Sequence, residues 1–237
     1  MSEAKSAAHP LDIDAVLFDL DGTLVDTAPD LAGALNCLRR DRGLIPMEIA
    51  ALRPYASAGA RGMIGAGFDV ATDHQSYPEL RDAFLAHYEA AICVDSRLFE
   101  EMDAVLAELE QRRLPWGIVT NKATRFTRPL MAALTLPFAP HVLVCGDTTA
   151  HAKPHPAPLL HAAEALNVAP GRCLYVGDSE RDVTAAIAAG MQVIVARYGY
   201  IEPHEQPHTW PAHGHIEHPR ELIAWLPGPR TEAQASR

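Results

Sequence analysis

The sequence predicts an α/β fold in which a parallel sheet carries helices on both faces and an all-helical segment is inserted after the first strand. Short apolar runs suited to buried strands lie at 14–18, 115–119, 141–145, 173–177 and 192–196. Helical patterns lie between most of them, at 99–112, 123–134, 157–167 and 180–189. Strands that alternate with helices in this way are typical of a parallel sheet.

The first strand leads directly into two aspartates. Residues 15–27 read Ala-Val-Leu-Phe-Asp-Leu-Asp-Gly-Thr-Leu-Val-Asp-Thr. Strand side chains alternate with period 2, so Asp19 and Asp21 can project the same way. Two close carboxylates are hard to ionise together without a cation, which favours a hard metal ion such as Mg²⁺. Gly22 lets the backbone turn sharply beside a ligand, although a plain Asp-Gly turn is the alternative interpretation.

The interval from 26 to 95 differs from the rest of the chain. It shows helical patterns, as in 30–40 and 79–91, and no convincing strand. About seventy residues are far too many for one connecting loop. We therefore expect an inserted helical domain over 26–95, with hinges near Asp26 and Asp95.

Polar residues also follow two later segments. Strand 115–119 ends at Thr120 and Asn121, where the Thr120 hydroxyl and the Asn121 backbone N–H are possible donors to a phosphoryl oxygen. A Thr/Asn helix cap is the commoner interpretation of that pair alone. Lys153 precedes a proline and is one of only three lysines, against seventeen arginines. Its compact ammonium can neutralise a phosphoryl oxygen and a carboxylate together, whereas an isolated lysine would more often lie on the surface.

Strand 173–177 runs into Asp178, Ser179 and, one helical turn later, Asp182. Asp178 follows the strand where a metal held by Asp19 can be reached, and Asp182 lies on the same side. Ser179 is also an ordinary helix N-cap, so this segment alone is ambiguous. Ligands of open α/β sheets bind outside the carboxyl ends of the strands, so we expect all these polar groups to converge on one site.

In this order, the four segments resemble the four motifs of the haloacid dehalogenase superfamily of phosphotransferases, over residues from about 14 to about 200. Within it, the chain resembles the phosphoglycolate phosphatase group. The resemblance implies a Rossmann-like core domain at 1–25 and 96–237, and a helical cap domain at 26–95. A cap that closes over the site excludes water and strengthens electrostatic interactions at the phosphoryl group.

The resemblance also implies roles for the aspartates. Asp19 attacks phosphorus and forms an aspartyl-phosphate, while Asp21 acts as general acid and then as general base. Mg²⁺ is held by the side chains of Asp19 and Asp178 and by the backbone carbonyl of Asp21, and Gly22 lies beside the phosphate.

The remaining motif residues are expected to bind and orient. Thr120, the N–H of Asn121 and Lys153 hold the transferring oxygens, where negative charge must be stabilised. Asp182 and Ser179 are expected to support these residues without contacting the phosphoryl group, and Asp182 to orient Lys153 or a metal-bound water.

The inner face of the cap is expected to contact the leaving group. The best candidate is Ser57-Ala58-Gly59-Ala60-Arg61-Gly62. The small residues Ser57 and Gly59 permit close approach, a helix can begin there, and Arg61 can bind a carboxylate or phosphate with two donors. A glycine-containing loop with a surface arginine is the competing interpretation.

Absent features separate the branches of the superfamily. Residues 26–95 contain no lysine, so the Schiff base of the phosphonate-cleaving branch is excluded. Asp21 argues against the dehalogenase branch, and the lack of membrane spans argues against the P-type ATPases. A phosphomonoesterase or a sugar-phosphate mutase remains. A non-catalytic phospho-ligand sensor is disfavoured, because a binder needs no nucleophile beside an acid.

The substrate is predicted to be a small phosphorylated metabolite. Phosphoglycolate is the first candidate, since Arg61 can bind its carboxylate. A phosphorylated amino sugar is the second, because the tail around 197–201, with Trp210 and His218-Pro219, resembles that of the N-acetylmuramic acid 6-phosphate phosphatases.

The net charge, the cysteine content and the lack of long apolar segments disfavour other classes of function. The net charge of −10 disfavours a nucleic-acid partner. Four cysteines without a Cys-x-x-Cys pair predict free thiols in a reducing cytoplasm. No signal peptide or membrane span is expected, and the ends, 1–10 and 228–237, are expected to fray. Either a monomer or a homodimer is compatible with the sequence.

Histidines crowd the C-terminal region. His213, His215 and His218 have a spacing that permits Zn²⁺ binding. The segment is rich in proline and has no strong ligand frame, so we interpret it as a polar surface loop.

Overall fold

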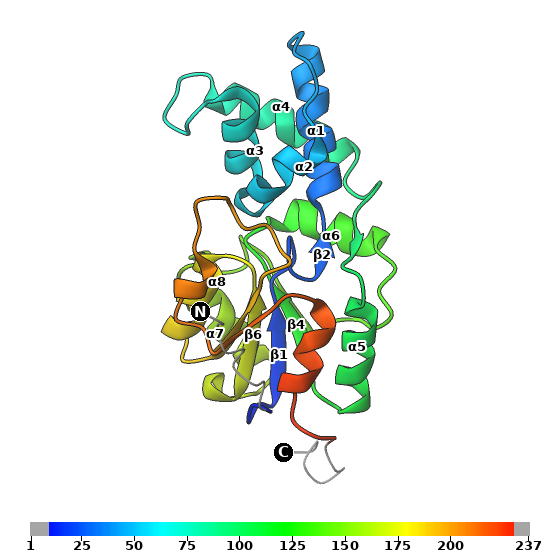
Figure 1. Ribbon diagram of the computed structural model, residues 1–237, viewed down its shortest axis with the longest axis vertical. Helices are drawn as coiled ribbons and strands as arrows, with labels where there is room; N and C mark the ends of the chain where they lie inside the picture. The colour runs from blue at the N-terminus through cyan, green and yellow to red at the C-terminus, as the bar shows by residue number, and fades with distance from the viewer. Residues whose placement is uncertain (1–9, 230–237) are drawn as a thin grey trace, which may run out of the picture.

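The computed structural model describes residues 10–229. Within them, six parallel strands form one sheet in the order β5-β4-β1-β6-β7-β8 (Figure 1). The strands are β1 (Ala15–Phe18), β4 (Trp116–Val119), β5 (Val142–Val144), β6 (Cys173–Gly177), β7 (Gln192–Ala196) and β8 (Gly214–Ile216). Every residue of β1, β4 and β6 is buried, which is why these segments are continuous apolar runs rather than alternating ones.

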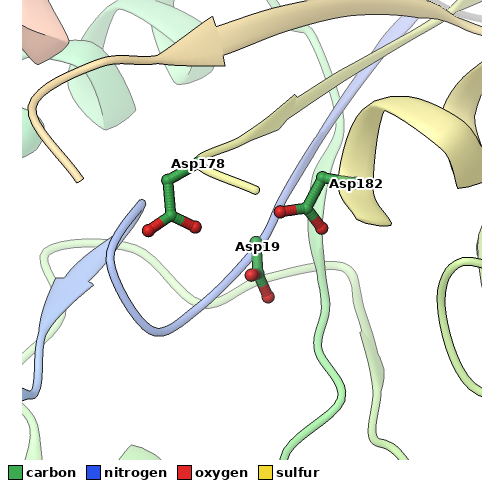
Figure 2. A group of neighbouring side chains, drawn as sticks. All are labelled: Asp19, Asp178 and Asp182. Atoms are coloured by element: carbon green, nitrogen blue, oxygen red, sulfur yellow. The ribbon is translucent and has the colours of Figure 1, made fainter. Parts of the chain in front are cut away.

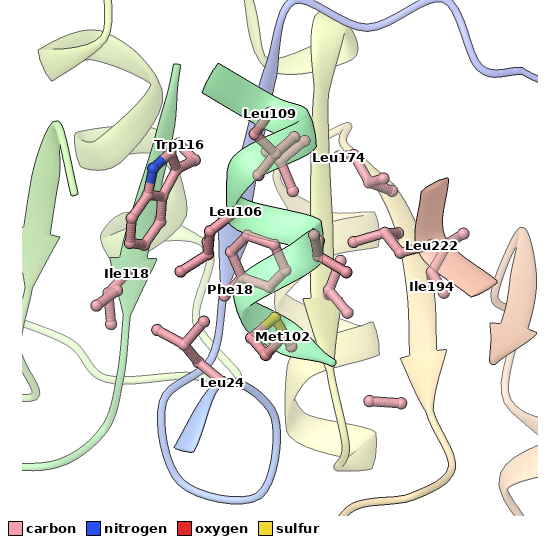
Figure 3. Close-up of a cluster of buried hydrophobic side chains, with 14 of the residues drawn as sticks. Phe18, Leu24, Met102, Leu106, Leu109, Trp116, Ile118, Leu174, Ile194 and Leu222 are labelled. Atoms are coloured by element: carbon pink, nitrogen blue, oxygen red, sulfur yellow. The ribbon is translucent and has the colours of Figure 1, made fainter. Parts of the chain in front are cut away.

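Helices cover both faces of this sheet, as predicted (Figure 1). The helices of the core are α5 (Met102–Gln111), α6 (Thr124–Ala133), α7 (Ala157–Ala165), α8 (Glu180–Ala188) and the 3₁₀ helices η2 (Pro170–Arg172), η3 (Pro207–Thr209) and η4 (Pro219–Trp225). Val16 and Phe18 of β1 pack with α5 and η4 in one cluster, part of which Figure 3 shows. Ala15 and Leu17 pack with α7 and α8 on the other face, so the alternation of a single strand builds both halves of the core.

The helical insert lies beyond the carboxyl ends of the strands (Figure 1). Its elements, with the short strands that flank it, are β2 (Val25–Asp26), α1 (Ala28–Asp41), α2 (Ile49–Leu52), η1 (Arg53–Ala58), α3 (Gly59–Phe68), α4 (Tyr77–Ala90) and β3 (Arg97–Leu98). Leu35, Met63 and Phe84 belong to a separate hydrophobic cluster within it. The helical nature of the insert is confirmed, whereas domain boundaries at 26 and 95 stay a prediction.

A network that we call the hinge cluster ties the insert to the core; it consists of Asp26, Asp30, Arg53 and Tyr200. The Tyr200 hydroxyl accepts hydrogen bonds from the backbone N–H groups of residues 27 and 28, at 2.6 and 2.8 Å, and donates to Asp26 at 2.7 Å. Arg53 pairs with Asp26 at 3.0 Å. The buried Asp30 accepts from the backbone N–H groups of residues 94, 95 and 96 and from the hydroxyl of residue 96, so one carboxylate fixes the returning chain.

Some elements depart from the sequence prediction. The short strands β2 and β3 pair antiparallel at the base of the insert, and β8 adds a sixth strand where a surface loop was expected. Each has only two or three residues, too few to show a periodic pattern. Because β8 contains His215, the expectation of a surface loop is wrong for this part of the histidine segment.

Two further expectations concern the chain as a whole. All four cysteines are free, as predicted. None of the helices within residues 10–229 is both long and apolar enough to span a membrane. The predicted frayed ends, 1–10 and 228–237, fall almost entirely outside the described residues.

Candidate active site

The carboxyl ends of β1, β4 and β6 open into a cavity of about 140 Å³ beneath the insert. Of the residues singled out in the sequence, its wall contains Asp19, Asp21, Ser57, Gly59, Thr120, Asn121, Lys153, Ser179 and Asp182. The fold therefore brings together segments that lie more than 160 positions apart in the chain, as from Asp19 to Asp182. Both core and insert contribute to the wall.

Three carboxyl groups converge beside this cavity (Figure 2), two of them, Asp19 and Asp182, in its wall and the third, Asp178, behind it. Asp19 follows β1, Asp178 follows β6, and Asp182 lies in the first turn of α8; one oxygen of each lies within 4.8 Å of the others. Burial raises the pKa of Asp19 to about 6, against the lowering effect of Lys153. Burial and the Asp19 charge raise the pKa of the fully buried Asp178 well above its usual range. Ionising both Asp19 and Asp178 would therefore place negative charge in a buried setting that the protein does not fully offset.

Lys153 compensates only part of that charge. Its buried Nζ lies 2.7 Å from Asp182 Oδ1 and 2.9 Å from Asp19 Oδ1, and it also donates to the Val119 carbonyl and the Tyr175 hydroxyl. Burial by itself lowers the pKa of Lys153, but the two carboxylates raise it above its usual value, so the ammonium stays charged. Lys153 is thus a fixed cation directly beside Asp19.

Asp182 is held from two sides. Its Oδ2 accepts hydrogen bonds from the backbone N–H and hydroxyl of Ser179, at 3.1 and 2.7 Å, which forms a capping box at the start of α8. Although burial opposes it, Lys153 holds the pKa of Asp182 below its usual range. Both oxygens of Asp182 are thus engaged, one by Lys153 and the other by Ser179. The role of Asp182 in orienting Lys153 stays a prediction.

Asn121 clamps the loop that carries Lys153. Its side-chain amide donates to the Lys153 carbonyl at 2.8 Å and accepts from the Lys153 N–H at 2.9 Å. The sequence analysis considered only the backbone N–H of Asn121, so this positioning function of its side chain was missed. The neighbouring Thr120 is buried, and its hydroxyl accepts from the backbone N–H of residue 122.

Gly22 is required by the close approach of two loops. Its φ is +88°, and a Cβ there would lie 2.0 Å from Asp178 Oδ2 and 2.8 Å from the Tyr200 ring. Asp178 Oδ2 in turn accepts a hydrogen bond from the backbone N–H of Tyr200, at 2.7 Å. Only glycine at this position allows the turn after β1 to pack directly against Asp178.

Lys122 is a site residue whose role the sequence analysis did not identify. Its Nζ pairs with Asp21 Oδ1 at 2.9 Å, and the same oxygen accepts from the Thr27 hydroxyl at 2.5 Å. Nζ also lies 4.6 Å from the centroid of the Tyr88 ring, which belongs to α4 of the insert. Burial by itself lowers the pKa of Lys122, but Asp21 and Tyr88 raise it above its usual value. The scarcity of lysine, with Lys122 directly after Thr120-Asn121, was the available signal.

Arg61, the arginine proposed from the sequence, is exposed and does not line the cavity of Asp19. It lines a neighbouring cavity of about 210 Å³, beside Glu202 and His204. Arg181 of α8 lines both cavities instead, and its Nη2 donates to the Ser57 carbonyl at 2.8 Å. Arg181 follows Ser179 by two positions, so the helix start that places the capping box also places this guanidinium.

The donor set suits a hard divalent cation. Asp178 Oδ2 accepts from Tyr200, and Oδ1 has only a long contact of 3.5 Å with the Thr23 hydroxyl. Asp178 therefore faces Asp19 without a cation partner in the part of the chain that the structure describes. Two adjacent carboxylates with all-oxygen ligands fit Mg²⁺. Both oxygens of Asp182 are already engaged, by Lys153 and by Ser179, whereas Asp19 meets Lys153 through Oδ1 alone. Asp178 and the second oxygen of Asp19 therefore remain to hold the ion.

The C-terminal histidines show no comparable arrangement. His213 Nδ1 accepts from the Val193 N–H, and His215 Nε2 donates to the Pro207 carbonyl. Within residues 10–229, the carboxylates of Asp19, Asp178 and Asp182 form the one cluster of three or more metal-ligating side chains.

Known proteins resemble this chain over most of its length. Residues 13–190 match the haloacid dehalogenase-like hydrolase family. The chain is 42% identical to an N-acetylmuramic acid 6-phosphate phosphatase of Pseudomonas aeruginosa over 209 residues, 88% of this chain and 92% of that protein. It is 43% identical to a phosphoglycolate phosphatase of Xanthomonas campestris over 216 residues, 90% of this chain and 95% of that protein.

A solved structure shows the same fold. The crystal structure of a predicted phosphoglycolate phosphatase from Haemophilus somnus superposes with a TM-score of 0.76 at 26% identity, covering 90% of this chain and 97% of that one. The matched family spans all four motifs and the insert between the first two. The chain therefore belongs to the haloacid dehalogenase-like hydrolase family.

Proposed function

We propose that this protein is a Mg²⁺-dependent phosphomonoesterase that acts on a small phosphorylated metabolite through an aspartyl-phosphate intermediate, with phosphoglycolate as the first candidate substrate. One observation carries the proposal: the buried Asp19 carboxylate lies 2.9 Å from the Lys153 ammonium and opposite Asp178, inside a cavity that the insert covers. A carboxylate fixed beside a cation that also holds a phosphoryl oxygen is an oriented nucleophile.

Asp19 and the residues around it have different roles in the two steps of the reaction. In the first step an oxygen of Asp19 forms a bond to phosphorus, and the bond from phosphorus to the leaving oxygen breaks. Asp21 gives a proton to that oxygen, and in the second step it takes a proton from the water that attacks the aspartyl-phosphate. Thr120, the N–H of Asn121 and Lys153 stabilise the charge on the transferring oxygens. When bound between Asp19 and Asp178, Mg²⁺ offsets the charge of these carboxylates and of the phosphate.

A second candidate substrate is N-acetylmuramic acid 6-phosphate. It is favoured by the 42% identity to the Pseudomonas aeruginosa phosphatase, which is close to the 43% for the phosphoglycolate phosphatase of Xanthomonas campestris. The two substrates share a chemical feature, since both are phosphate monoesters of a carboxylic acid. A sugar-phosphate mutase is a weaker candidate, because it would return the phosphoryl group to a sugar rather than to water.

The test is a hydrolysis assay with 4-nitrophenyl phosphate, phosphoglycolate and N-acetylmuramic acid 6-phosphate, with and without Mg²⁺. We expect phosphate release that depends on Mg²⁺ and is fastest with one of the two acids. Full activity after exhaustive chelation would exclude the metal assignment. Isomerisation of a sugar 1-phosphate without free phosphate, in the presence of a bisphosphate activator, would show a mutase instead.

A further inference from the structure

Arg181 connects helix α8, which also carries Asp182, to the insert. It lies in the first turn of α8, between Ser179 and Asp182, which form the capping box. Its Nη2 reaches across to η1 of the insert, where it donates to the Ser57 carbonyl at 2.8 Å and contacts the Ser57 hydroxyl at 3.4 Å. The base of the side chain is therefore fixed to the core, and its tip is fixed to the insert.

The position of Arg181 separates two cavities. The inner cavity, of about 140 Å³, contains Asp19 and Lys153. The outer one, of about 210 Å³, lies under Arg61 and beside Glu202. Arg181 and Ser57 belong to the walls of both. In an in-line attack by Asp19 the leaving group lies on the far side of the phosphorus. A leaving group that extends from the inner cavity into the outer one would pass Arg181 and Ser57.

Three cationic side chains line the inner cavity, and Arg181 is the one that is not paired with a carboxylate in residues 10–229. Lys153 is bound to Asp19 and Asp182, and Lys122 is bound to Asp21. Arg181 makes no ion pair shorter than 4 Å with any carboxylate in residues 10–229, and only its Nη2 has a hydrogen-bond partner there. The Nε and Nη1 donors remain for a ligand. A guanidinium presents such donors as a planar fork that matches a carboxylate.

We propose that Arg181 determines the specificity of the enzyme by binding a carboxylate on the leaving group of the phosphate ester. The proposal rests on the phosphomonoesterase function and narrows its substrates to phosphate esters of carboxylic acids. The phosphoryl oxygens already have Lys153, Thr120 and the Asn121 N–H as partners, so the guanidinium is not required there. Because the Ser57 carbonyl holds Nη2, the fork is oriented while the insert is closed, and this lowers the cost of ordering it on binding.

The experiment uses two matched pairs of substrates with the full-length enzyme and Mg²⁺. Phosphoglycolate is compared with phosphoglycolamide, its neutral amide, and N-acetylmuramic acid 6-phosphate with N-acetylglucosamine 6-phosphate, which lacks the lactyl carboxylate. The variants are Arg181→Met, which keeps a long side chain without charge, and Arg181→Lys, which keeps charge without the fork. Arg61→Met serves as the matched arginine substitution, because Arg61 lines the outer cavity and not the inner one.

We expect Arg181→Met to lower kcat/KM on the preferred acid by roughly ten- to a hundredfold, the usual loss of a charged hydrogen bond. The matched neutral substrate should lose much less, so that the preference for the acid disappears. Arg181→Lys should retain an intermediate preference. Arg61→Met should retain the preference of the wild type.

Several outcomes would overturn the inference while the phosphatase function stands. One is a wild-type enzyme that hydrolyses each acid and its neutral partner equally well. Another is an Arg181→Met variant that keeps the preference, or that loses equally on all substrates, which would assign Arg181 to the phosphate or to the fold. Loss of the preference in Arg61→Met instead would return the role to Arg61. If the wild type hydrolyses none of the substrates, the proposed function itself fails.

Discussion

The floor of the active site and the hinge cluster both depend on buried carboxylates, but the two regions neutralise these charges differently. On the floor, which we define as Asp19, Lys153, Asp178 and Asp182, carboxylates lie against one another and share a single ammonium. In the hinge cluster, Asp30 accepts four hydrogen bonds from residues 94–96, three of them from backbone N–H groups.

This difference indicates a catalytic role for the floor and a structural role for the hinge cluster. The floor has more negative charge than its lysine can offset, and this excess favours a cation and a reactive carboxylate. The hinge cluster satisfies Asp30 by hydrogen bonds and Asp26 by a hydrogen bond and an ion pair with Arg53, and it leaves no excess charge for a ligand. Substitutions on the floor should therefore affect catalysis most, and those at the hinge should affect the stability of the insert.

The largest effect is expected on the floor, from Asp19→Asn. A neutral amide is a poor nucleophile toward phosphorus, so turnover of 4-nitrophenyl phosphate should fall by several orders of magnitude. The substitution is nearly isosteric and removes a charge that burial disfavours, so the thermal unfolding temperature of the metal-free protein should not fall. Near wild-type activity in the purified variant would mean that Asp19 is not the nucleophile.

Lys153→Met should show how strongly the floor depends on its one ammonium. The substitution leaves Asp182 and Asp19 without their cation in a buried setting. Removing one partner of a buried ion pair typically costs about 3–5 kcal/mol, so urea-induced unfolding should shift strongly toward lower urea concentration. A shift of under about 1 kcal/mol, the range of exposed pairs, would show that solvent or a metal ion already screens these carboxylates.

Mg²⁺ should stabilise the folded protein in a pH-dependent way. Since the pKa of Asp19 is raised to about 6 in the folded protein, the metal-free protein binds more protons than the unfolded chain below that pH, and its stability falls as pH rises toward 6. Above pH 6 the ionised carboxylate is free for the metal. At one hundred times its Kd, a ligand adds about 2.7 kcal/mol.

Thermal unfolding with and without Mg²⁺ tests this at pH 7.5 and pH 5. The increase in unfolding temperature should be clear at pH 7.5 and smaller at pH 5, where protons compete for Asp19. An equal increase at both pH values would contradict a site built on this carboxylate. Asp19→Asn is the control, and its response to Mg²⁺ should be weaker at pH 7.5.

The comparison also shows what a single sequence can reveal. The strands that end at Asp19 and Asp178 were predictable because a buried parallel strand is a continuous apolar run and each ends in a short polar motif. The cavity wall includes most of the predicted residues for the same reason, since strand ends converge whatever the details of packing. Lys153, although far along the chain, belonged to the same ordered set.

Other contacts could not be read from the sequence because they join segments without periodic signals. The contact of Lys122 with the Tyr88 ring and the hydrogen bond from the Ala28 N–H of α1 to the Tyr200 hydroxyl depend on how the insert packs on the core. Arg61 was chosen because small residues surround it, but its position on α3 points it to the outer cavity. Strand β8 has three residues, too few to show alternation.

At the hinge, Asp30→Ala should destabilise the protein less than a substitution of Lys153. It leaves several N–H groups of residues 94–96 without their acceptor, but these lie near the surface, where water can replace it. A loss of hydrogen bonds to a charged group typically costs about 1.5–3 kcal/mol. Hydrogen exchange should quicken at residues 94–96 before it quickens in β1. Unchanged exchange there would mean that Asp30 does not fix the returning chain.

The smallest effect is expected at the other end of the same helix. Arg42, just after α1, pairs with Glu79 of α4 at 2.7 Å, but the two side chains are 40% and 73% exposed. Exposed ion pairs typically contribute about 0.2–1 kcal/mol and weaken with salt. Arg42→Ala should therefore shift urea unfolding only slightly, and the shift should shrink in 1 M salt. Asp30 lies in the first turn of α1 and Arg42 caps its other end. A larger loss for Arg42→Ala than for Asp30→Ala would therefore show that the insert is held by its outer surface, and the contrast between hinge and surface would be wrong.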